Sequence, residues 1–450
     1  MILTTIDLMI IVVYFIVLLL IGFYSSKQKD DEEFLIAGRN LGTLSTMATL
    51  NASKTGSILM VFVALVYVWG ISALWYFVGA IVGVLLFIPF AMRLKDLSQK
   101  KYYTLADYFK HNYNVKIAKL ISIITIFLMF GFMVLNLIAG SKVFMFFTGW
   151  SFWVCAILMA VIVLIYLLLG GYKAVAKTDI LQYIAILSIM VLLFIVLFST
   201  STIPTSEFNI FKADLLTIIG FFIVGILSPF ALPDIWQRVY SARSKKVLKN
   251  GMLLSIAVYA AIALLLGFIA LIVKLNFPGI DPDLALVHGF ANLLPAGLIG
   301  LSIVLLFSAI MSSVDTLIYT GSSAIVQDFY KLEKKETVSM IKKWLVVFTA
   351  IGTVVAIILR SLVVSTYIFV SFVLVISVVV IATWVKKEIK PLSLRFGTII
   401  GALSIISMLV YYLVIGDGIQ PVMVIYGIVA TVLGLMVGGI VGKLQAKNST

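Results

Sequence analysis

A single lysine interrupts a long apolar stretch near the N-terminus. Lys54 is the only charged residue between Arg39 and Arg93, and residues 41–70 around it are otherwise apolar enough to span a bilayer. At about 1.5 Å per residue, Lys54 lies about 20 Å deep, near the midplane. An ammonium group there costs at least about 2.5 kcal/mol, so we expect it to face protein or a water-filled cavity. Residues 51–57 (Asn-Ala-Ser-Lys-Thr-Gly-Ser) are polar and contain a glycine. This pattern predicts an interrupted helix and a binding site near the membrane centre.

Two adjacent hydroxyl groups lie in a second apolar stretch. Ser312 and Ser313, with the carbonyl of Ala309 one turn earlier, place several oxygens on one helix face. Hard cations are bound by oxygen ligands of this kind. Serines in membrane helices also bond the carbonyl four residues earlier or allow close helix packing, so both interpretations stay open. Asp315 favours a functional role, because carboxylates inside a membrane are usually functional.

The composition is that of a polytopic membrane protein. Of the 450 residues, 63% are hydrophobic and 12% are charged, whereas soluble domains average about 25% charged residues. We therefore expect an all-α membrane protein forming a single transmembrane domain over residues 1–450. The first apolar segment lacks a basic n-region and a small-residue cleavage site, so it is expected to be a retained membrane helix. Cys155 is the one cysteine and is expected to be inert packing.

Apolar runs separated by charged breaks predict thirteen membrane spans. Most of the 33 basic residues lie in every second connection, which places the N-terminus outside and the C-terminus in the cytoplasm. The net charge of +14 is then a signal of topology, and no binding of nucleic acid is expected. The expected spans are residues 5–25, 41–69, 71–92, 117–147, 150–169, 180–200, 214–233, 250–273, 297–325, 343–360, 362–385, 397–415 and 420–442.

Two of these spans contain helix-breaking residues at corresponding places. The second span is interrupted around residues 51–57, and the seventh contains Gly220, Gly225, Pro229 and Pro233. Proline removes a backbone donor and obstructs the carbonyl four residues earlier. Broken spans five helices apart, in opposite orientation, are typical of the inverted repeats of secondary transporters. We expect spans 2–6 (about residues 41–200) and 7–11 (about residues 214–385) to form the two repeats.

The segment between the fifth and sixth expected spans is rich in glycine and lysine. Residues 170–179 read Gly-Gly-Tyr-Lys-Ala-Val-Ala-Lys-Thr-Asp. Glycines give the backbone freedom and lysines mark the inner side, so the segment predicts a cytoplasmic turn. Residues 233–238 (Pro-Asp-Ile-Trp-Gln-Arg) similarly fit the inner end of the seventh span.

These segments together resemble the sodium:solute symporter family over nearly the whole chain. The most specific part is residues 308–331, which looks closest to the proline permease branch through Ala309-Ile-Met-Ser-Ser and Ser322-Ser-Ala-Ile-Val-Gln-Asp-Phe-Tyr-Lys. Residues 37–42, the GG…TD…Q pattern of residues 170–182 and the pair Gln237-Arg238 are also similar, although Tyr172 departs from the usual aliphatic residue.

The resemblance implies a leucine-transporter-type fold that works by alternating access. It implies a Na⁺ site made of the carbonyls of Ala52 and Thr55, the carbonyl of Ala309, and the hydroxyls of Ser312 and Ser313. The charged residues expected to take part in coupling are Lys54, Asp315 and Asp179.

Lys54 is where the chain departs from the proline permease branch, which has an aspartate at this position. Two cations a few ångströms apart in a poorly solvated cavity repel by several kcal/mol at an effective dielectric near 20. In one interpretation Lys54 points away, pairing with Asp315 or a carbonyl, and Na⁺ still binds. In a second, its ammonium occupies the sodium position, and transport is sodium-independent or proton-coupled. In a third, Lys54 binds the carboxylate of an anionic solute.

The expected function is secondary active transport of a small organic solute of the amino acid, sugar or vitamin class. Asn136, which is among the expected solute contacts, could equally form a hydrogen bond to a neighbouring helix. No catalytic residues and no cofactor are expected apart from a possible Na⁺ ion, so the chain is not expected to be an enzyme. A transporter-like ligand sensor is the alternative class. We expect a monomer or weak oligomer in the lipid bilayer of a prokaryotic cytoplasmic membrane. The expected solute contacts are Asn51, Ser53, Ser57, Asn136, Phe222 and Ser228.

Overall fold

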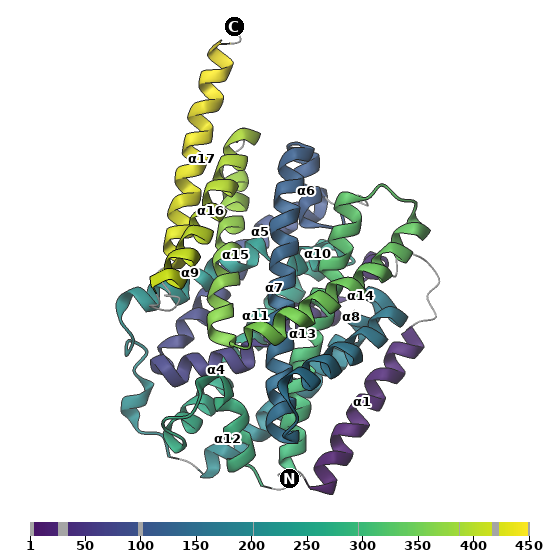
Figure 1. Ribbon diagram of the computed structural model, residues 1–450, viewed down its shortest axis with the longest axis vertical. Helices are drawn as coiled ribbons and strands as arrows, with labels where there is room; N and C mark the ends of the chain where they lie inside the picture. Colours follow the sequence, from purple (N-terminus) through teal and green to yellow (C-terminus); the bar gives the residue numbers. More distant parts are fainter. Residues whose placement is uncertain are drawn as a thin grey trace.

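The protein is an all-helical bundle (Figure 1). The computed structural model describes residues 4–25, 35–97, 102–200, 202–295, 297–386, 388–415 and 423–448. No strand occurs within these ranges, where one isolated bridge joins Leu41 and Ala242. The helices are α1 (Thr5–Ser25), α3 (Thr43–Thr55), α4 (Ile58–Trp69), α5 (Leu74–Leu97), α6 (Leu105–Asn112), α7 (Val115–Thr148), α8 (Phe152–Thr200), α9 (Leu215–Ala231), α10 (Pro233–Ser241), α11 (Lys245–Asn276), α12 (Ala285–Leu293), α13 (Leu298–Phe329), α14 (Lys334–Leu359), α15 (Leu362–Val385), α16 (Pro391–Ile415) and α17 (Met423–Asn448).

Many of these helices are long and apolar enough to cross a membrane. Within the described ranges there are ten such helices, or eleven if the bent pair α9–α10 is one span. Two places account for part of the difference from the expected thirteen. The helices α4 and α5, joined by the 3₁₀ turn η2 (Gly70–Ala73), form one stretch, Ile58–Leu97, and the described apolar part of α1 is the shorter Thr5–Leu20. The chain is thus a multi-pass, all-α membrane protein.

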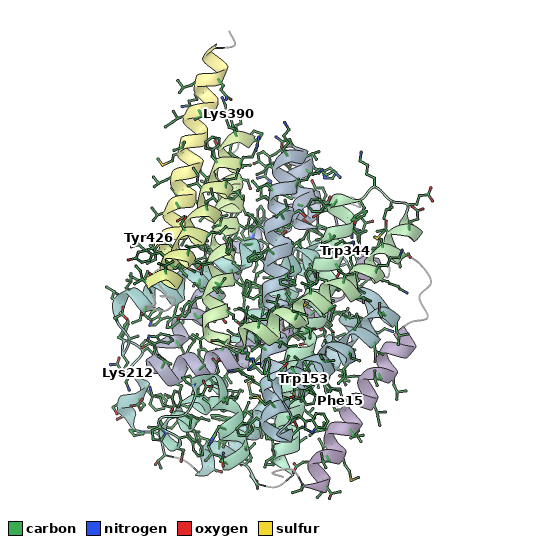
Figure 2. All side chains as sticks on the ribbon, in the orientation of Figure 1. Phe15, Trp153, Lys212, Trp344, Lys390 and Tyr426 are labelled. Carbon is green, nitrogen blue, oxygen red and sulfur yellow. The ribbon has the colours of Figure 1, made fainter. Side chains whose placement is uncertain are left out.

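The bundle is arranged around α13. This helix is buried along most of its length and packs against α7, α8, α3 and α14 (Figure 1). The pair α16 and α17 lies at one edge of the bundle and α1 at the opposite edge in this view. Large apolar side chains such as Trp153 and Tyr426 project outward and are 53% and 48% exposed (Figure 2). An apolar outer surface is the one a bilayer solvates.

The predicted interruption of the second span is confirmed. Helix α3 ends at Thr55 and α4 begins at Ile58. The freed backbone donors find partners inside the protein, because Gly56 N–H donates to Ser313 Oγ at 3.0 Å and Ser57 N–H donates to Asn136 Oδ1 at 2.7 Å. A broken helix at membrane depth requires such partners. Glycine is needed at position 56, since a Cβ there would lie 2.2 Å from Ser313 Oγ.

The seventh span is also broken, and the break lies between its two prolines. Pro229 lies inside α9, and the break falls at Leu232, where α9 and α10 meet at a bend of 46°. Pro233 begins α10, a position where proline is favoured because its missing N–H has no helical partner. The expected end of this span at residue 233 is therefore wrong. The second half continues to Ser241 and carries Asp234 and Arg238 into the bundle.

The cytoplasmic turn predicted for residues 170–179 is wrong. Helix α8 runs through this segment and contains two apolar stretches, Phe152–Leu169 and Val175–Ser199. Tyr172 and Asp179 are buried, and the Tyr172 hydroxyl lies 3.3 Å from Ser241 Oγ. The local glycine and lysine signal is overridden because Tyr172 and Asp179 find partners on α10 rather than in water.

Candidate functional site

The expected sodium ligands come together at the break between α3 and α4. The carbonyl of Ala52 accepts hydrogen bonds from Ser312 Oγ at 3.2 Å and from Ser313 Oγ at 3.1 Å. Ser312 Oγ also donates to the carbonyl of Ala309 at 2.8 Å, one turn earlier on α13. The Thr55 hydroxyl donates to the Ala52 carbonyl at 3.2 Å. All five residues are buried, so the structure brings this predicted set into one cluster.

The donor set in this cluster consists of neutral oxygens. Carbonyl oxygens come from the broken helix and from α13, and hydroxyl oxygens come from Ser312 and Ser313 on α13 and from Thr55 on α3. Such ligands suit a hard monovalent cation, which needs partial negative charge but no full counter-charge. A bound cation would take the oxygen lone pairs and turn the Ser312 and Ser313 protons away from Ala52. The residues present therefore fit Na⁺.

Lys54 lies beside this cluster and is not part of it. It is in the last turn of α3, and its Nζ lies 5.7 Å from the centre of the Tyr259 ring on α11, within the range of a cation–π contact. Within the described part of the chain no hydrogen bond joins the ammonium to Ser312 or Ser313, and no ion pair joins it to Asp315. The expected pairing of Lys54 with Asp315 is thus not present.

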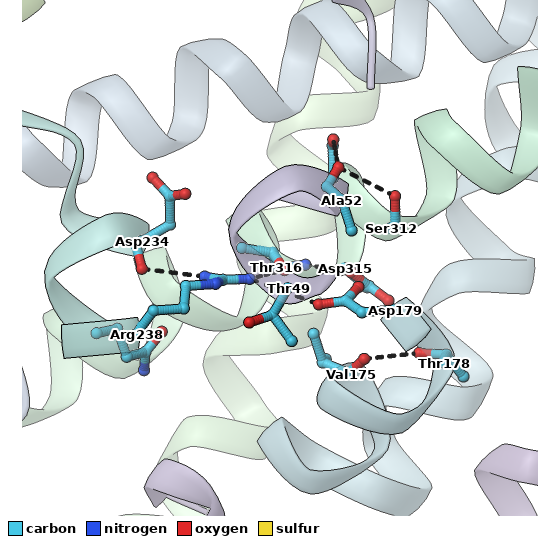
Figure 3. A network of polar contacts seen from close by, with 12 residues as sticks. Thr49, Ala52, Val175, Thr178, Asp179, Asp234, Arg238, Ser312, Asp315 and Thr316 are labelled. Carbon is cyan, nitrogen blue, oxygen red and sulfur yellow. Dashed lines mark hydrogen bonds and ion pairs between the residues drawn. The ribbon is translucent and has the colours of Figure 1, made fainter. Parts of the chain in front are cut away.

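Asp315 and Asp179 belong to a second buried cluster, which Figure 3 shows around Arg238. Arg238 Nη2 lies 3.6 Å from Asp179 Oδ2 and donates to Thr316 Oγ1 at 2.9 Å. Asp315 Oδ1 accepts from the Thr316 N–H at 2.5 Å. The two partners of the ion pair are both 0% exposed. This cluster joins α8, α10 and α13 below the sodium ligands.

A cavity separates the two broken helices. The space in it that is open to water-sized molecules is about 150 Å³. It lies between the α3–α4 break, α7, α9, α13 and α15. Its polar lining includes Lys54, Ser57, Tyr76, Asn136, Ser228, Asp234, Ser313, Thr366 and Tyr367.

Three of the six expected solute contacts line this cavity, namely Ser57, Asn136 and Ser228. Asn136 also bonds the backbone of Ser57, so its amide helps to hold the break.

Asn51 and Phe222 are not part of the described lining. Asn51 points to α11, where its side chain exchanges hydrogen bonds with Ser255 at 2.6 and 3.2 Å. Phe222 packs against Trp75, with ring centres 6.2 Å apart. The side chain of Ser53 is outside what the structure describes.

Sequence reasoning missed the parts of the site that lie on α10, α11 and α15. Asp234 and Arg238 lie in a segment that was interpreted as the inner end of a helix. The signal that could have revealed a second half-helix is the polar run Asp-Ile-Trp-Gln-Arg, which follows two prolines. Tyr259 and Tyr367 gave no local signal, because a single tyrosine in an apolar helix is most often packing.

Comparison with known proteins decides the family. Residues 34–387, well over half of the chain, match the family described as the sodium:solute symporter family. The chain belongs to the sodium:solute symporter family. Members of this family are membrane transporters and not enzymes, which agrees with the expected class.

Curated relatives within the family include two sodium/proline symporters. Sodium/proline symporter 2 of Staphylococcus saprophyticus is 30% identical over 332 residues, which is 68% of this chain. The sodium/proline symporter of Staphylococcus aureus strain Newman is 29% identical over 327 residues, again 68% of this chain. The matched region covers 64% of the length of each relative, less than two thirds.

Solved structures confirm the fold expected for this symporter family. A Na⁺-coupled sialic acid symporter in a substrate-bound, outward-open state superimposes with a TM-score of 0.79 and 19% identity, covering 97% of this chain and 98% of that one. A nucleobase-cation-symport-1 family transporter gives a TM-score of 0.61 and 12% identity over 90% of this chain and 93% of that one. The fold is thus the leucine-transporter type.

Proposed function

We propose that this symporter-family chain is a secondary active transporter that moves a small organic solute by alternating access and is coupled to Na⁺. The observation that carries the proposal is the convergence of the Ala52 and Ala309 carbonyls with the Ser312 and Ser313 hydroxyls at a helix break. Membership of the family supports it. Na⁺ is here a transported co-substrate.

The same residues suggest how ion and solute communicate. Ser313 belongs to the sodium ligands through Ala52 and also lines the solute cavity. Its hydroxyl accepts from the Gly56 N–H in the break itself. An ion that draws Ser313 and Ala52 together would fix the α3–α4 break against α13, and the solute would then bind to a cavity wall that is already ordered. Binding of the ion would then raise the affinity for the solute, which is positive coupling between the two sites.

The proposal includes the finer topology, with thirteen spans, an outer N-terminus and an inner C-terminus in the cytoplasmic membrane. The repeats are about residues 41–200 and 214–385. The breaks at residues 56–57 and 232, one in each repeat, support this division. In this topology the cavity extends toward Val363 and Thr366 at the outer start of α15, while the Arg238 cluster closes the inner side. The described conformation then faces outward. A monomer or weak oligomer in a bilayer, without nucleic acid, completes the proposal.

Sodium-independent or proton-coupled transport, with Lys54 in place of the ion, is the second candidate. It requires the ammonium to lie among the hydroxyls of Ser312 and Ser313. The contact of Lys54 with the Tyr259 ring weighs against that placement, so Na⁺ coupling is the better supported mechanism. A transporter-like sensor would bind solute without moving it.

Transport in proteoliposomes tests the proposal. Solute counterflow is measured with Na⁺ inside and outside, and again with K⁺ in its place. We expect counterflow to require Na⁺, and Ser313→Ala to raise the Na⁺ concentration for half-maximal rate by about tenfold or more, because a ligand is lost. The matched control is Ser302→Ala on the same helix, since among the described residues the Ser302 hydroxyl donates only to the carbonyl of Ile299. Equal rates in Na⁺ and K⁺ would exclude sodium coupling, and ligand binding without any flux would favour the sensor.

A further inference from the structure

A groove with several basic side chains lies at the end of the bundle where α17 ends. It is formed by the start of α7, the start of α16 and the last turns of α17. The space in it that is open to water-sized molecules is about 390 Å³. Figure 2 shows Lys390 at this end, beside α17. Lys116, Lys390 and Arg395 all line the groove, and within the described part of the chain no acidic residue does.

The three cations of this groove have no acidic partner. Within the described ranges no ion pair joins Lys116, Lys390 or Arg395 to a carboxylate. The Lys390 ammonium donates to the carbonyl of Gly442 at 2.9 Å, which uses one of its three N–H donors. Glu388, two residues before Lys390, is exposed and is not part of the lining. The groove therefore favours a ligand with negative charge.

The contribution of basic residues to membrane topology does not explain this convergence. The positive-inside rule concerns how many basic residues a connection carries, and it does not require them to face one another. Lys116 lies at the start of α7, whereas Lys390 and Arg395 lie at the start of α16, far away in the sequence. Packing of α7 against α16 brings them together. The N-termini of both helices meet the same groove and add to its preference for an anion.

On both helices the basic residue is followed by exposed apolar side chains on the same face. Ile123 lies about two turns after Lys116 on α7 and is 56% exposed. Ile406 lies about three turns after Arg395 on α16 and is 47% exposed. A polar headgroup at the membrane surface and an acyl chain below it have this same order. A free phosphate compound, in contrast, would leave the apolar faces without a partner.

We propose that this groove binds the headgroup of an anionic phospholipid in the inner leaflet of the membrane. The phosphate would accept two parallel hydrogen bonds from the Arg395 guanidinium and further bonds from the ammonium groups of Lys116 and Lys390. Basic pockets between helices at the cytoplasmic surface are suited to such headgroups. The inference rests on the topology proposed above, which places this end of the bundle inside, and it goes beyond the proposed transport function.

A lipid in this groove would connect the edge of the bundle to its centre. The pair α16 and α17 lies at one edge, whereas α7 packs against the central helix α13 (Figure 1). A ligand that binds only the folded protein stabilises it by mass action. Anionic lipid should therefore raise the thermal stability of the protein as well as remain bound to it.

The first test adds defined lipids to the purified protein in detergent. Native mass spectrometry counts bound lipid, and thermal unfolding measures stability, with phosphatidylglycerol, phosphatidylcholine of the same acyl chains, and glycerol phosphate. We expect phosphatidylglycerol to bind at least about tenfold more tightly than the other two and to raise the Tm. Equal binding of the two lipids would overturn the proposal. Binding of glycerol phosphate as tight as that of phosphatidylglycerol would also overturn it, because the site would then take a free phosphate compound.

The second test removes the three cations. A variant that combines Lys116→Gln, Lys390→Gln and Arg395→Gln should bind phosphatidylglycerol about tenfold or more weakly and lose the increase in Tm that the lipid causes. Unchanged lipid binding in this variant would overturn the assignment. If the variant does not fold, the comparison of lipids on the unmodified protein decides.

The matched control removes the same types and number of charges elsewhere. It combines Arg243→Gln, Lys246→Gln and Lys249→Gln, which are exposed near the start of α11, and it should bind phosphatidylglycerol as the unmodified protein does. Equal losses in the two variants would show a general effect of charge and overturn the site. Lipid binding in detergent requires no transport, so its failure leaves the transport function standing. Absence of solute counterflow would likewise leave the lipid site standing.

Discussion

The guanidinium of Arg238 lies 3.6 Å from the carboxylate of Asp179, and neither side chain is exposed to solvent. The pair joins the long helix α8 to the half-helix α10, directly after the break at Leu232. Arg238 is further held by Thr316 on α13. A buried ion pair of this kind contributes little over an apolar contact, but removing one partner leaves an uncompensated charge.

Asp179→Asn should therefore destabilise the protein by about 3–5 kcal/mol, because Arg238 keeps its charge without its partner. Thermal unfolding in detergent measures the effect. Asp96→Asn is the matched control, since Asp96 pairs with Lys245 at positions that are 51% and 44% exposed. That change should cost no more than about 1 kcal/mol. Equal losses in the two variants would contradict a structural role for the buried pair.

Gly56→Ala should abolish transport. A Cβ at this position would meet Ser313 Oγ at 2.2 Å and Asn136 Oδ1 at 2.3 Å, the two groups that satisfy the break. Overpacking of a well-packed site costs about 1–3 kcal/mol, and here it also displaces a sodium ligand. Uptake and thermal stability measure the two effects. Gly220→Ala in α9 is the control, because nothing lies within 4 Å of its added Cβ, and it should transport normally.

Asp283 holds three parts of the proposed outer side together. Its Oδ2 accepts from Lys142 Nζ at 2.9 Å and from the Leu362 N–H at the start of α15, also at 2.9 Å. Asp283→Ala should lower stability by about 1–3 kcal/mol, since the Leu362 N–H loses its acceptor and Lys142 keeps only its more distant ion pair with Asp281 at 3.9 Å. It should also speed solute release toward the outer side, as measured by radiolabel dissociation.

The pair Lys212–Glu207, whose side chains are 41% and 17% exposed, provides the control for that prediction. Glu207→Gln should change stability by less than about 1 kcal/mol and leave dissociation unaltered. A dissociation rate in Asp283→Ala that matches the unmodified protein would show that this contact stabilises the fold without gating the cavity.

Lys54 should oppose the binding of Na⁺, because its ammonium group and the ion would lie in the same poorly solvated region. Two like unit charges less than about 15 Å apart repel by about 1 kcal/mol or more at an effective dielectric of 20. Lys54→Met should therefore raise the affinity for Na⁺ by about fivefold or more. Thermal shift titration with Na⁺ measures the change.

Lys246→Met should leave that titration unchanged, because Lys246 is exposed at the start of α11. An unchanged Na⁺ affinity in Lys54→Met would contradict electrostatic coupling. It would leave the sodium site itself unaffected, since that site is tested separately by Ser313→Ala.

The parts of the site that the sequence predicted were those with a strong local signal. A polar, glycine-containing run inside an apolar stretch indicated the break that the structure shows between Thr55 and Ile58. Adjacent hydroxyls beside a carbonyl indicated the oxygen cluster of Ser312 and Ser313. In each case the high cost of polar groups in a membrane makes their presence informative.

Predictions from local sequence were wrong where contacts between buried side chains determine the helix boundaries. Residues 170–179 have the composition of a turn, yet they are helical because Asp179 and Tyr172 bind α10 across the bundle. Gly220, Gly225, Pro229 and Pro233 were all expected to interrupt the seventh span, but Pro229 lies inside α9 and the break falls beside Pro233, which starts the second half-helix.

The sequence alone determined that this chain spans a membrane, where its second helix breaks, and that Lys54 is an expensive charge needing a reason. Only the tertiary structure decided where its side chain lies. Lys54 and Asp234 are separated by most of the first repeat, and no periodicity relates them. They share a cavity because two broken helices face each other across the bundle, and that packing lies in contacts distant in sequence.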